Sequence, residues 1–169
     1  MNQSYWLLGT LTRILADDET TEGRYDLIEG TFQPGVATPM HRHTAYSELL
    51  FGLEGEFTVP TNAGVVVVKP GENFFIPRGT VHAVVSGPGL ARGLVVASPS
   101  GFARLLKAAG TPADSTGLLP TTPPDMAAFA QASAEVGDEV IGPPRPAGSR
   151  LRSLPPAIYK RRRSFMLPT

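Results

Sequence analysis

The chain has 169 residues, about the usual size of one domain, and its 15 Lys and Arg residues balance its 15 Asp and Glu residues. This balance gives no overall field that would attract nucleic acid or an anionic membrane surface, so we expect neither as a partner. The sequence lacks cysteine, a signal-like N-terminus and a run of about eighteen apolar residues, which excludes disulfides and thiolate chemistry and predicts a soluble cytoplasmic protein.

From residue 6 to residue 97, short stretches rich in Val, Ile, Leu, Phe and Thr alternate with turn-forming residues. Segments rich in Gly, Pro, Asn and Asp separate these stretches and favour turns. Many short strands at such spacing predict an all-β sandwich or barrel. The predicted strands are residues 6–16, 24–33, 38–43, 48–59, 65–69, 73–76, 81–86 and 92–97.

Two short helices are predicted after the strands. Apolar residues recur at helical spacing from Phe102 to Ala109, where Gly110 ends the pattern. A second pattern runs from about Pro124, a residue favoured in the first helical turn, to Gly137. We expect both helices to cover the outside of the barrel. From residue 143 onward Pro, Gly and Arg dominate, so we expect one domain over residues 1–142 and an irregular tail over residues 143–169.

The three histidines of the chain stand where they could share a metal ion. His41 and His43 are two residues apart, and an extended segment points such a pair to the same face of a sheet. Glu48 follows His43 by five residues, an odd offset that requires a bend between residues 44 and 47 if both are to face inward. His82 would come from a distant strand. Three imidazoles and a carboxylate suit one divalent transition metal per chain, namely Fe, Ni, Mn, Co or Zn.

These residues lie in two segments that also share a pattern of glycines and a proline. The first segment contains Gly35, His41, His43, Glu48 and Gly55, and the second contains Gly71, Pro77, Gly79, His82 and Ser86. The two segments resemble the paired signature motifs of the cupin superfamily, in which the position of Ser86 is often asparagine. That departure concerns the polarity of the pocket and not metal binding. The resemblance implies a cupin-type double-stranded β-helix, a jelly-roll barrel, with His41, His43, Glu48 and His82 as metal ligands.

Residues 5–11, 23–25 and 101–112 extend the resemblance to small single-domain cupins described as quercetin dioxygenase-like. This resemblance implies a metal-dependent dioxygenase that acts on a flavonol-like or other enolisable small molecule with dioxygen. Glu48 would be both a weak metal ligand and the catalytic base, and the histidines would hold the metal. Inward-facing side chains are expected to form the substrate pocket, and the candidates are Tyr46, Phe57, Phe75, Val84 and Ser86.

Other functions remain open at this point. A metal-dependent isomerase would need charged or hydroxyl-bearing pocket residues, of which few are available, and a non-catalytic cupin that binds a small ligand would carry the same motifs. A basic run at residues 160–163, together with Arg150 and Arg152, is the one feature that favours nucleic acid, and such runs are usually solvated tails. We also expect a homodimer, because barrels of this size often pair through edge strands such as residues 6–16.

Overall fold

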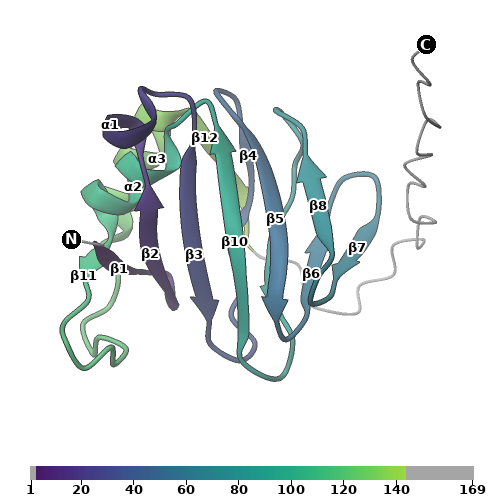
Figure 1. The fold of residues 1–169 in the computed structure, drawn as a ribbon, viewed down its shortest axis with the longest axis horizontal. Helices are drawn as coiled ribbons and strands as arrows, with labels where there is room; N and C mark the ends of the chain where they lie inside the picture. The colour runs from purple at the N-terminus through teal and green to yellow at the C-terminus, as the bar shows by residue number, and fades with distance from the viewer. Residues whose placement is uncertain (1–2, 144–169) are drawn as a thin grey trace, which may run out of the picture.

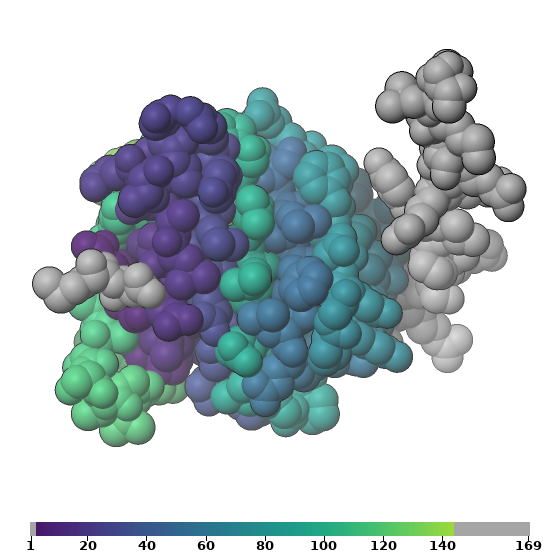
Figure 2. Space-filling model, in the orientation of Figure 1, coloured from purple at the N-terminus to yellow at the C-terminus, as the bar shows by residue number. Residues whose placement is uncertain are grey.

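A computed structural model describes residues 3–143 and shows two layers of β-sheet, with helices gathered beside one end of the larger sheet (Figure 1). The larger sheet has the strand order β11-β1-β2-β3-β10-β5-β8, and all its pairings are antiparallel. Packed side chains cover the face of this sheet that Figure 2 presents. Its strands are β1 (Ser4–Leu7), β2 (Thr10–Ala16), β3 (Asp26–Phe32), β5 (Ser47–Glu54), β8 (Asn73–Ile76), β10 (Ala91–Ser98) and β11 (Thr111–Pro112).

The second layer consists of two smaller sheets. One pairs β4 (Met40–His43) with β12 (Asp138–Gly142), and the other has the order β7-β6-β9. The strands of the latter are β6 (Phe57–Pro60), β7 (Val65–Val68) and β9 (Val85–Ser86). His41 and His82 connect the two small sheets, because each backbone N–H donates to the other's carbonyl at 2.8 Å. The all-β barrel predicted from the sequence is confirmed.

The core lies between the two layers. Along β3 and β5 buried residues alternate with partly exposed ones, the period-two pattern of strands that bury one face. Phe32 of the larger sheet meets Phe57 of the smaller sheet edge to face, with ring centroids 5.2 Å apart. Such a pair contributes about 0.5–1.5 kcal/mol beyond the area it buries. These contacts hold the two layers together around the site described below.

Residues 3–143 contain three helices: α1 (Asp18–Thr21), α2 (Phe102–Ala109) and α3 (Met126–Val136). The Asp125 carboxylate accepts hydrogen bonds from two backbone N–H groups of the first turn of α3, and Gly137 ends that helix with a φ of 81°. Helices α2 and α3 pack against each other through Leu105 and Phe129. The sequence predicted that both helices cover the outside of the barrel; side chains of both also line a cavity described below.

Several element boundaries differ from those predicted. Residues 6–16 form two strands because Leu8 and Gly9 both adopt positive φ, 49° and 84°, and make a tight hairpin turn. Residues 48–59 divide at Gly55, whose φ of 66° lets the chain pass from the larger sheet to the smaller one. Helix α1 and strands β11 and β12 were not predicted, because local hydrophobic periodicity does not reveal elements this short or this polar. The predicted tail lies outside the described residues, apart from residue 143.

Candidate metal centre

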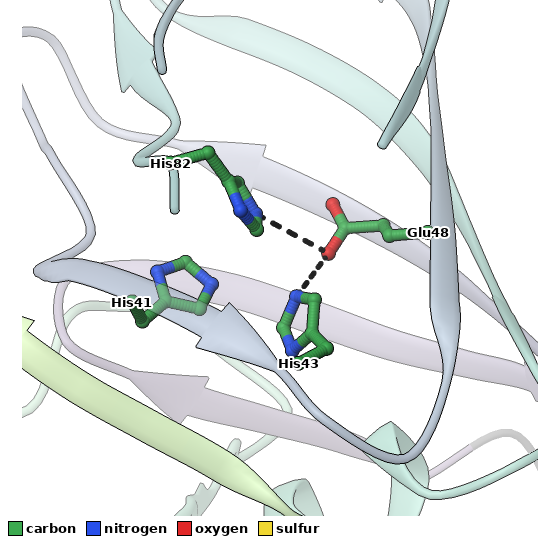
Figure 3. Close-up of side chains that lie close together, drawn as sticks. All are labelled: His41, His43, Glu48 and His82. Carbon is green, nitrogen blue, oxygen red and sulfur yellow. Dashed lines mark hydrogen bonds and ion pairs between the residues drawn. The ribbon is translucent and has the colours of Figure 1, made fainter. Parts of the chain in front are cut away.

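The four predicted ligands converge inside the barrel. One ligand atom from each of His41, His43, Glu48 and His82 lies within 4.8 Å of the corresponding atoms of the other three. Figure 3 shows the imidazoles and the carboxylate pointing toward a common centre. His41 and His43 come from β4, Glu48 comes from β5, and His82 lies shortly before β9. The cluster therefore joins the larger sheet to the smaller sheets.

A bend between β4 and β5 brings Glu48 to the inner face. Strand β4 ends at His43 and β5 begins at Ser47, so the two strands belong to different sheets. Within β5, Glu48 and Leu50 are buried on the same face. The bend predicted for residues 44–47 is present, and it removes the conflict with the odd spacing of Glu48 from His43.

The Nδ1 atom of each histidine has a hydrogen-bond acceptor. His41 Nδ1 lies 2.8 Å from the Pro39 carbonyl oxygen, and His82 Nδ1 lies 2.9 Å from the Thr80 carbonyl oxygen. His43 Nδ1 lies 2.6 Å from a carboxylate oxygen of Asp138. Because a carbonyl or carboxylate oxygen can only accept, Nδ1 carries the proton in each ring. The Nε2 atoms are thereby left to face the centre, which is the arrangement of metal-binding histidines with an outer hydrogen-bond partner.

Burial and neighbouring charges set the protonation of the cluster. Burial, together with the nearby imidazoles His82 and His43, lowers the pKa of His41 to about 3, and burial also lowers the pKa of His82. Burial acts in the same direction on His43, but hydrogen bonds from His43 to Asp138 and Glu48 outweigh it and raise the pKa of His43 to about 9. For Glu48 the contact with His43 outweighs burial and lowers the carboxyl pKa to about 2.

The donor set therefore fits a divalent transition metal. The lowered pKa values of His41 and His82 favour the neutral form that binds a metal, and Glu48 is ionised. His43 Nε2, 2.8 Å from Glu48 Oε2, would give up its proton when a metal binds. His82 Nε2 is buried and has no hydrogen-bond partner among residues 3–143. An unsatisfied buried polar atom costs about 1–3 kcal/mol, and a cation bound by this nitrogen would remove that cost. Three imidazoles and one carboxylate are suitable ligands for several borderline divalent ions.

An apolar cavity adjoins the cluster. Its volume, including its open mouth, is about 850 Å³, and His41, His43 and Glu48 form part of its wall. The remaining wall is mainly aliphatic and aromatic and comes from both sheets and from α2 and α3, with Leu7, Ile28, Phe32, Val95, Phe102 and Phe129 among its residues. No Lys or Arg of the described chain lines it. The cavity therefore combines the cluster and a few other polar side chains, among them Thr10, Thr12 and Ser133, with a mainly apolar surface.

Val84 is the one predicted pocket residue that lines this cavity. Phe57 lies in the core between the layers, and the Phe75 side chain is on the outer face of β8, 55% exposed. The Ser86 hydroxyl donates to the backbone carbonyls of residues 33 and 36, at 2.7 and 3.1 Å. Ser86 therefore fixes the backbone of the loop before β4 and does not line the cavity. Tyr46 stacks on the His43 ring behind the cluster. Local strand alternation could not tell which inward side chains face the cavity and which face the core.

Sequence reasoning missed Asp138, which belongs to the site. This buried carboxylate accepts hydrogen bonds from His43 Nδ1 and, at 2.9 Å, from the hydroxyl of Tyr46. It also lines the cavity. Asp138 follows a helix-ending glycine, and nothing in its local sequence indicates that β12 pairs with β4, where Asp138 lies opposite His43. The pairing becomes visible only in three dimensions.

Fold and site together define a jelly-roll barrel that holds a three-histidine, one-carboxylate cluster in an apolar cavity. A family model described as "Cupin domain" matches residues 28–96. A solved structure, the polyketide cyclase RemF from Streptomyces resistomycificus, is 32% identical, with a TM-score of 0.52 over 59% of this chain and 75% of that one. The chain belongs to the cupin superfamily, as the sequence motifs predicted.

Two curated proteins show a more limited similarity. Quercetin 2,3-dioxygenase from Bacillus subtilis (strain 168) is 29% identical over 73 residues, which cover 43% of this chain and 22% of that protein. Nectarin-1 from Nicotiana plumbaginifolia is 35% identical over 102 residues, 57% of this chain and 43% of that protein. The chain thus spans less than half the length of these relatives. Within residues 3–143 the helices are too short, or not apolar enough, to cross a membrane.

Proposed function

We propose that the protein is a metal-dependent enzyme that acts on an uncharged, largely apolar small molecule with an enolisable or phenolic oxygen, such as a flavonol-like compound. The observation that carries this proposal is the His and Glu cluster set in the wall of an apolar cavity. A divalent metal here would supply a Lewis acid with coordination positions left for substrate oxygens. We place the metal on His41, His43, Glu48 and His82, one ion per chain.

The wall of the cavity supports the apolar class of substrate. Among the described residues no Lys or Arg lines it, so a phosphate or a second carboxylate of a substrate would have no cationic side chain to pair with. Burying such a charge without a partner is costly, whereas aliphatic and aromatic walls favour an apolar ring. A sugar isomerase would need polar groups to hold hydroxyls. Apart from the cluster and Asp138, the described wall offers the hydroxyl side chains of Thr10, Thr12, Thr38 and Ser133 in a mainly apolar surface, so the isomerase is the weaker alternative.

Glu48 is our candidate for the catalytic base. It is buried and lines the cavity, and its contact with His43 keeps it ionised, with a pKa of about 2. A carboxylate with so low a pKa is a weak base, so it suits a substrate whose O–H is already acidic, as in flavonol-like enols. Desolvation inside the cavity strengthens its interaction with a proton held close by.

Two activities compete within this proposal. The similarity to quercetin 2,3-dioxygenase supports a reaction with dioxygen, and it covers 43% of this chain. The similarity to a polyketide cyclase is higher, at 32% identity, and covers 75% of that protein, which supports cyclisation of a polyketide-like substrate as the competing activity. A cupin that binds such a molecule without converting it is the third possibility. Oxygen uptake separates the first activity from the other two.

The test starts with protein loaded in parallel with Fe, Ni, Mn, Co and Zn. Metal content, oxygen consumption and substrate loss are measured with flavonols and with polyphenolic polyketides, for wild type, His82→Ala and the outer-face control Phe75→Ala. Oxygen uptake in wild type and the control, lost in His82→Ala, supports the dioxygenase. Substrate conversion without oxygen uptake supports a cyclase. Ligand binding without conversion supports the binding protein, and a folded wild type that takes up no metal contradicts the metal-dependent proposal.

The homodimer and the cytoplasmic location expected from the sequence stay predictions. Light scattering on purified protein measures the first. The proposed reaction does not need the dimer, because all four ligands and the cavity wall belong to one chain.

A further inference from the structure

The outer partners of the three histidines are of two kinds. His41 and His82 are each held by the backbone carbonyl of the residue two positions earlier, at 2.8 and 2.9 Å. Any side chain at those earlier positions would leave the carbonyl in place. His43 instead meets a carboxylate 95 residues away in the sequence, at 2.6 Å. A negatively charged acceptor raises the basicity of an imidazole more than a neutral carbonyl does.

We infer that Asp138 is a positioning residue of the metal centre: it fixes the ring of His43, makes its Nε2 a stronger ligand, and is itself held in place by Tyr46. This inference rests on the proposed metal-dependent function. It adds to the site one carboxylate that lies outside the segment matched by the family model, residues 28–96.

Tyr46 completes the arrangement from the other side. Its hydroxyl donates to the second oxygen of Asp138 at 2.9 Å, and its ring stacks on the His43 ring with centroids 4.3 Å apart and an angle of 24° between the planes. Both oxygens of the carboxylate are therefore occupied, and His43 has Asp138 at its edge and Tyr46 against its face. All three side chains are buried. A ring held in this way loses little freedom when its other nitrogen binds a metal.

The backbone that delivers Asp138 is fixed next to the site. Gly137 ends α3 with a φ of 81°, and its carbonyl accepts hydrogen bonds from the backbone and side chain of Thr44, at 2.7 and 2.8 Å. A Cβ at Gly137 would approach the Thr44 hydroxyl to 2.9 Å, so the close approach requires glycine. Asp138 then pairs with His43 across the strands β12 and β4. Helix α3 and strand β12 thus add Asp138 to the ligand cluster that the two sequence motifs provide.

The test compares Asp138→Asn, Asp138→Ala and Tyr46→Phe with wild type in the full chain. Asparagine keeps an acceptor for His43 and a polar partner for Tyr46 but removes the charge, and Tyr46→Phe keeps the stacked ring but removes the hydroxyl. The matched control is Glu139→Gln, since Glu139 is on the same strand and pairs on the surface with Arg42. Zn²⁺ affinity is measured by competition with a chelator, and the visible spectrum of the Co²⁺ form reports the ligand field. The unfolding of the metal-free proteins is followed separately.

We expect Asp138→Ala to weaken Zn²⁺ binding by about 10–100-fold, the usual effect of losing an outer partner of a ligating histidine. Asp138→Asn should weaken it less and still alter the Co²⁺ spectrum, Tyr46→Phe should weaken it least, and Glu139→Gln should match wild type. If Asp138→Ala does not fold, the Zn²⁺ affinity and the Co²⁺ spectrum of Asp138→Asn test the inference on their own. Wild-type affinity and spectrum in folded Asp138→Asn, with only a lower stability of the metal-free form, would overturn the inference while leaving the metal centre intact. Absence of metal from wild type would instead contradict the proposed function itself.

Discussion

The segment matched by the cupin model and the segments that flank it contribute different parts of the site. Residues 28–96 carry all four candidate ligands. The flanking segments, residues 3–27 and 97–143, supply Leu7, Phe102 and Phe129 of the cavity wall and also Asp138. Proteins that share the first segment can therefore share a metal centre and still differ in the shape of the cavity. We therefore expect residues of the flanking segments to determine which substrate this chain binds.

The largest expected effect is the loss of the metal from the His82→Ala variant. This substitution lies in the segment matched by the cupin model and leaves the flanks unchanged. His82 Nε2 is the unpartnered buried nitrogen of the cluster, so alanine removes a ligand without breaking a hydrogen bond of that atom. Metal affinity should fall by more than the roughly 10–100-fold typical of losing an outer partner. Elemental analysis after dialysis against a chelator measures it. Thr80→Ala is the control, because His82 uses only the backbone carbonyl of Thr80. Retention of stoichiometric metal by His82→Ala would show that His82 is not a ligand.

The second prediction changes only the flanks. Phe129 is buried between α2 and α3 together with Leu105, and replacing a buried phenylalanine by alanine costs about 3–5 kcal/mol. We expect Phe129→Ala to lower the free energy of unfolding by about 3 kcal/mol. This value is the lower end of the range, because Phe129 borders a cavity and so lacks packing contacts on one side. Urea denaturation of the metal-free protein measures it, with the exposed Met126→Ala on the same helix as control. Metal affinity of the folded variant should stay at the wild-type value. A parallel loss of affinity would show that helix packing positions Asp138.

The contrast between the two segments also explains which features could be predicted from the sequence. The spacing of His41 and His43 puts both side chains on one face of a strand, and the odd offset of Glu48 requires a bend before it. The ligand cluster could therefore be predicted from strand periodicity and the motifs. Strand β5, which carries Glu48, is long enough for its alternation to show. Phe75 was misplaced because alternation gives two faces and does not say which one is outside: this residue, at the sheet's edge strand β8, faces out.

The position of Asp138 could not be predicted, for a different reason. Its contact with His43 depends on the length of the segment between α2 and α3, on the end of α3 at Gly137 and on the register of β12 with β4. None of these leaves a periodic pattern, since β12 is short and its middle residues are exposed. Long-range pairing of a polar edge strand is determined by tertiary contacts rather than by local preference.

A third prediction concerns a contact between the two flanking segments, in which Asp26, at the start of β3, caps α2. Its buried carboxylate accepts hydrogen bonds from the N–H groups of Gly101 and Ala103, at 2.8 and 2.9 Å. Loss of a helix cap costs about 0.5–2 kcal/mol, so Asp26→Ala should lower stability by about 1–2 kcal/mol. Asp26→Asn keeps an acceptor and should lose less.

The pH dependence of the same variants gives a sharper test. Burial raises the pKa of Asp26, so the folded state binds a proton more tightly than the unfolded state does. The stability that this proton contributes is fully present below the unfolded pKa and is lost as pH rises through the folded pKa. The stability of wild type relative to Asp26→Asn should therefore be greatest in acid and fall toward neutral pH, as measured by urea denaturation across that range. A constant difference would contradict the raised pKa.

The smallest effect is expected within the flanks, at the ion pair that joins α2 to the cap of α1. Lys107 Nζ lies 2.8 Å from Asp17 Oδ2, and this hydrogen bond holds the pKa of Asp17 below its usual range. Because both groups are partly exposed, Lys107→Gln should cost no more than about 1 kcal/mol, and less in high salt. The lowered pKa means that this contribution is present above the unfolded pKa of Asp17 and is lost as pH falls through the folded pKa. Denaturation at two salt concentrations, beside the exposed Lys69→Gln, measures it. A cost that does not change with salt would mean that packing of the lysine stem, rather than its charge, connects the two helices.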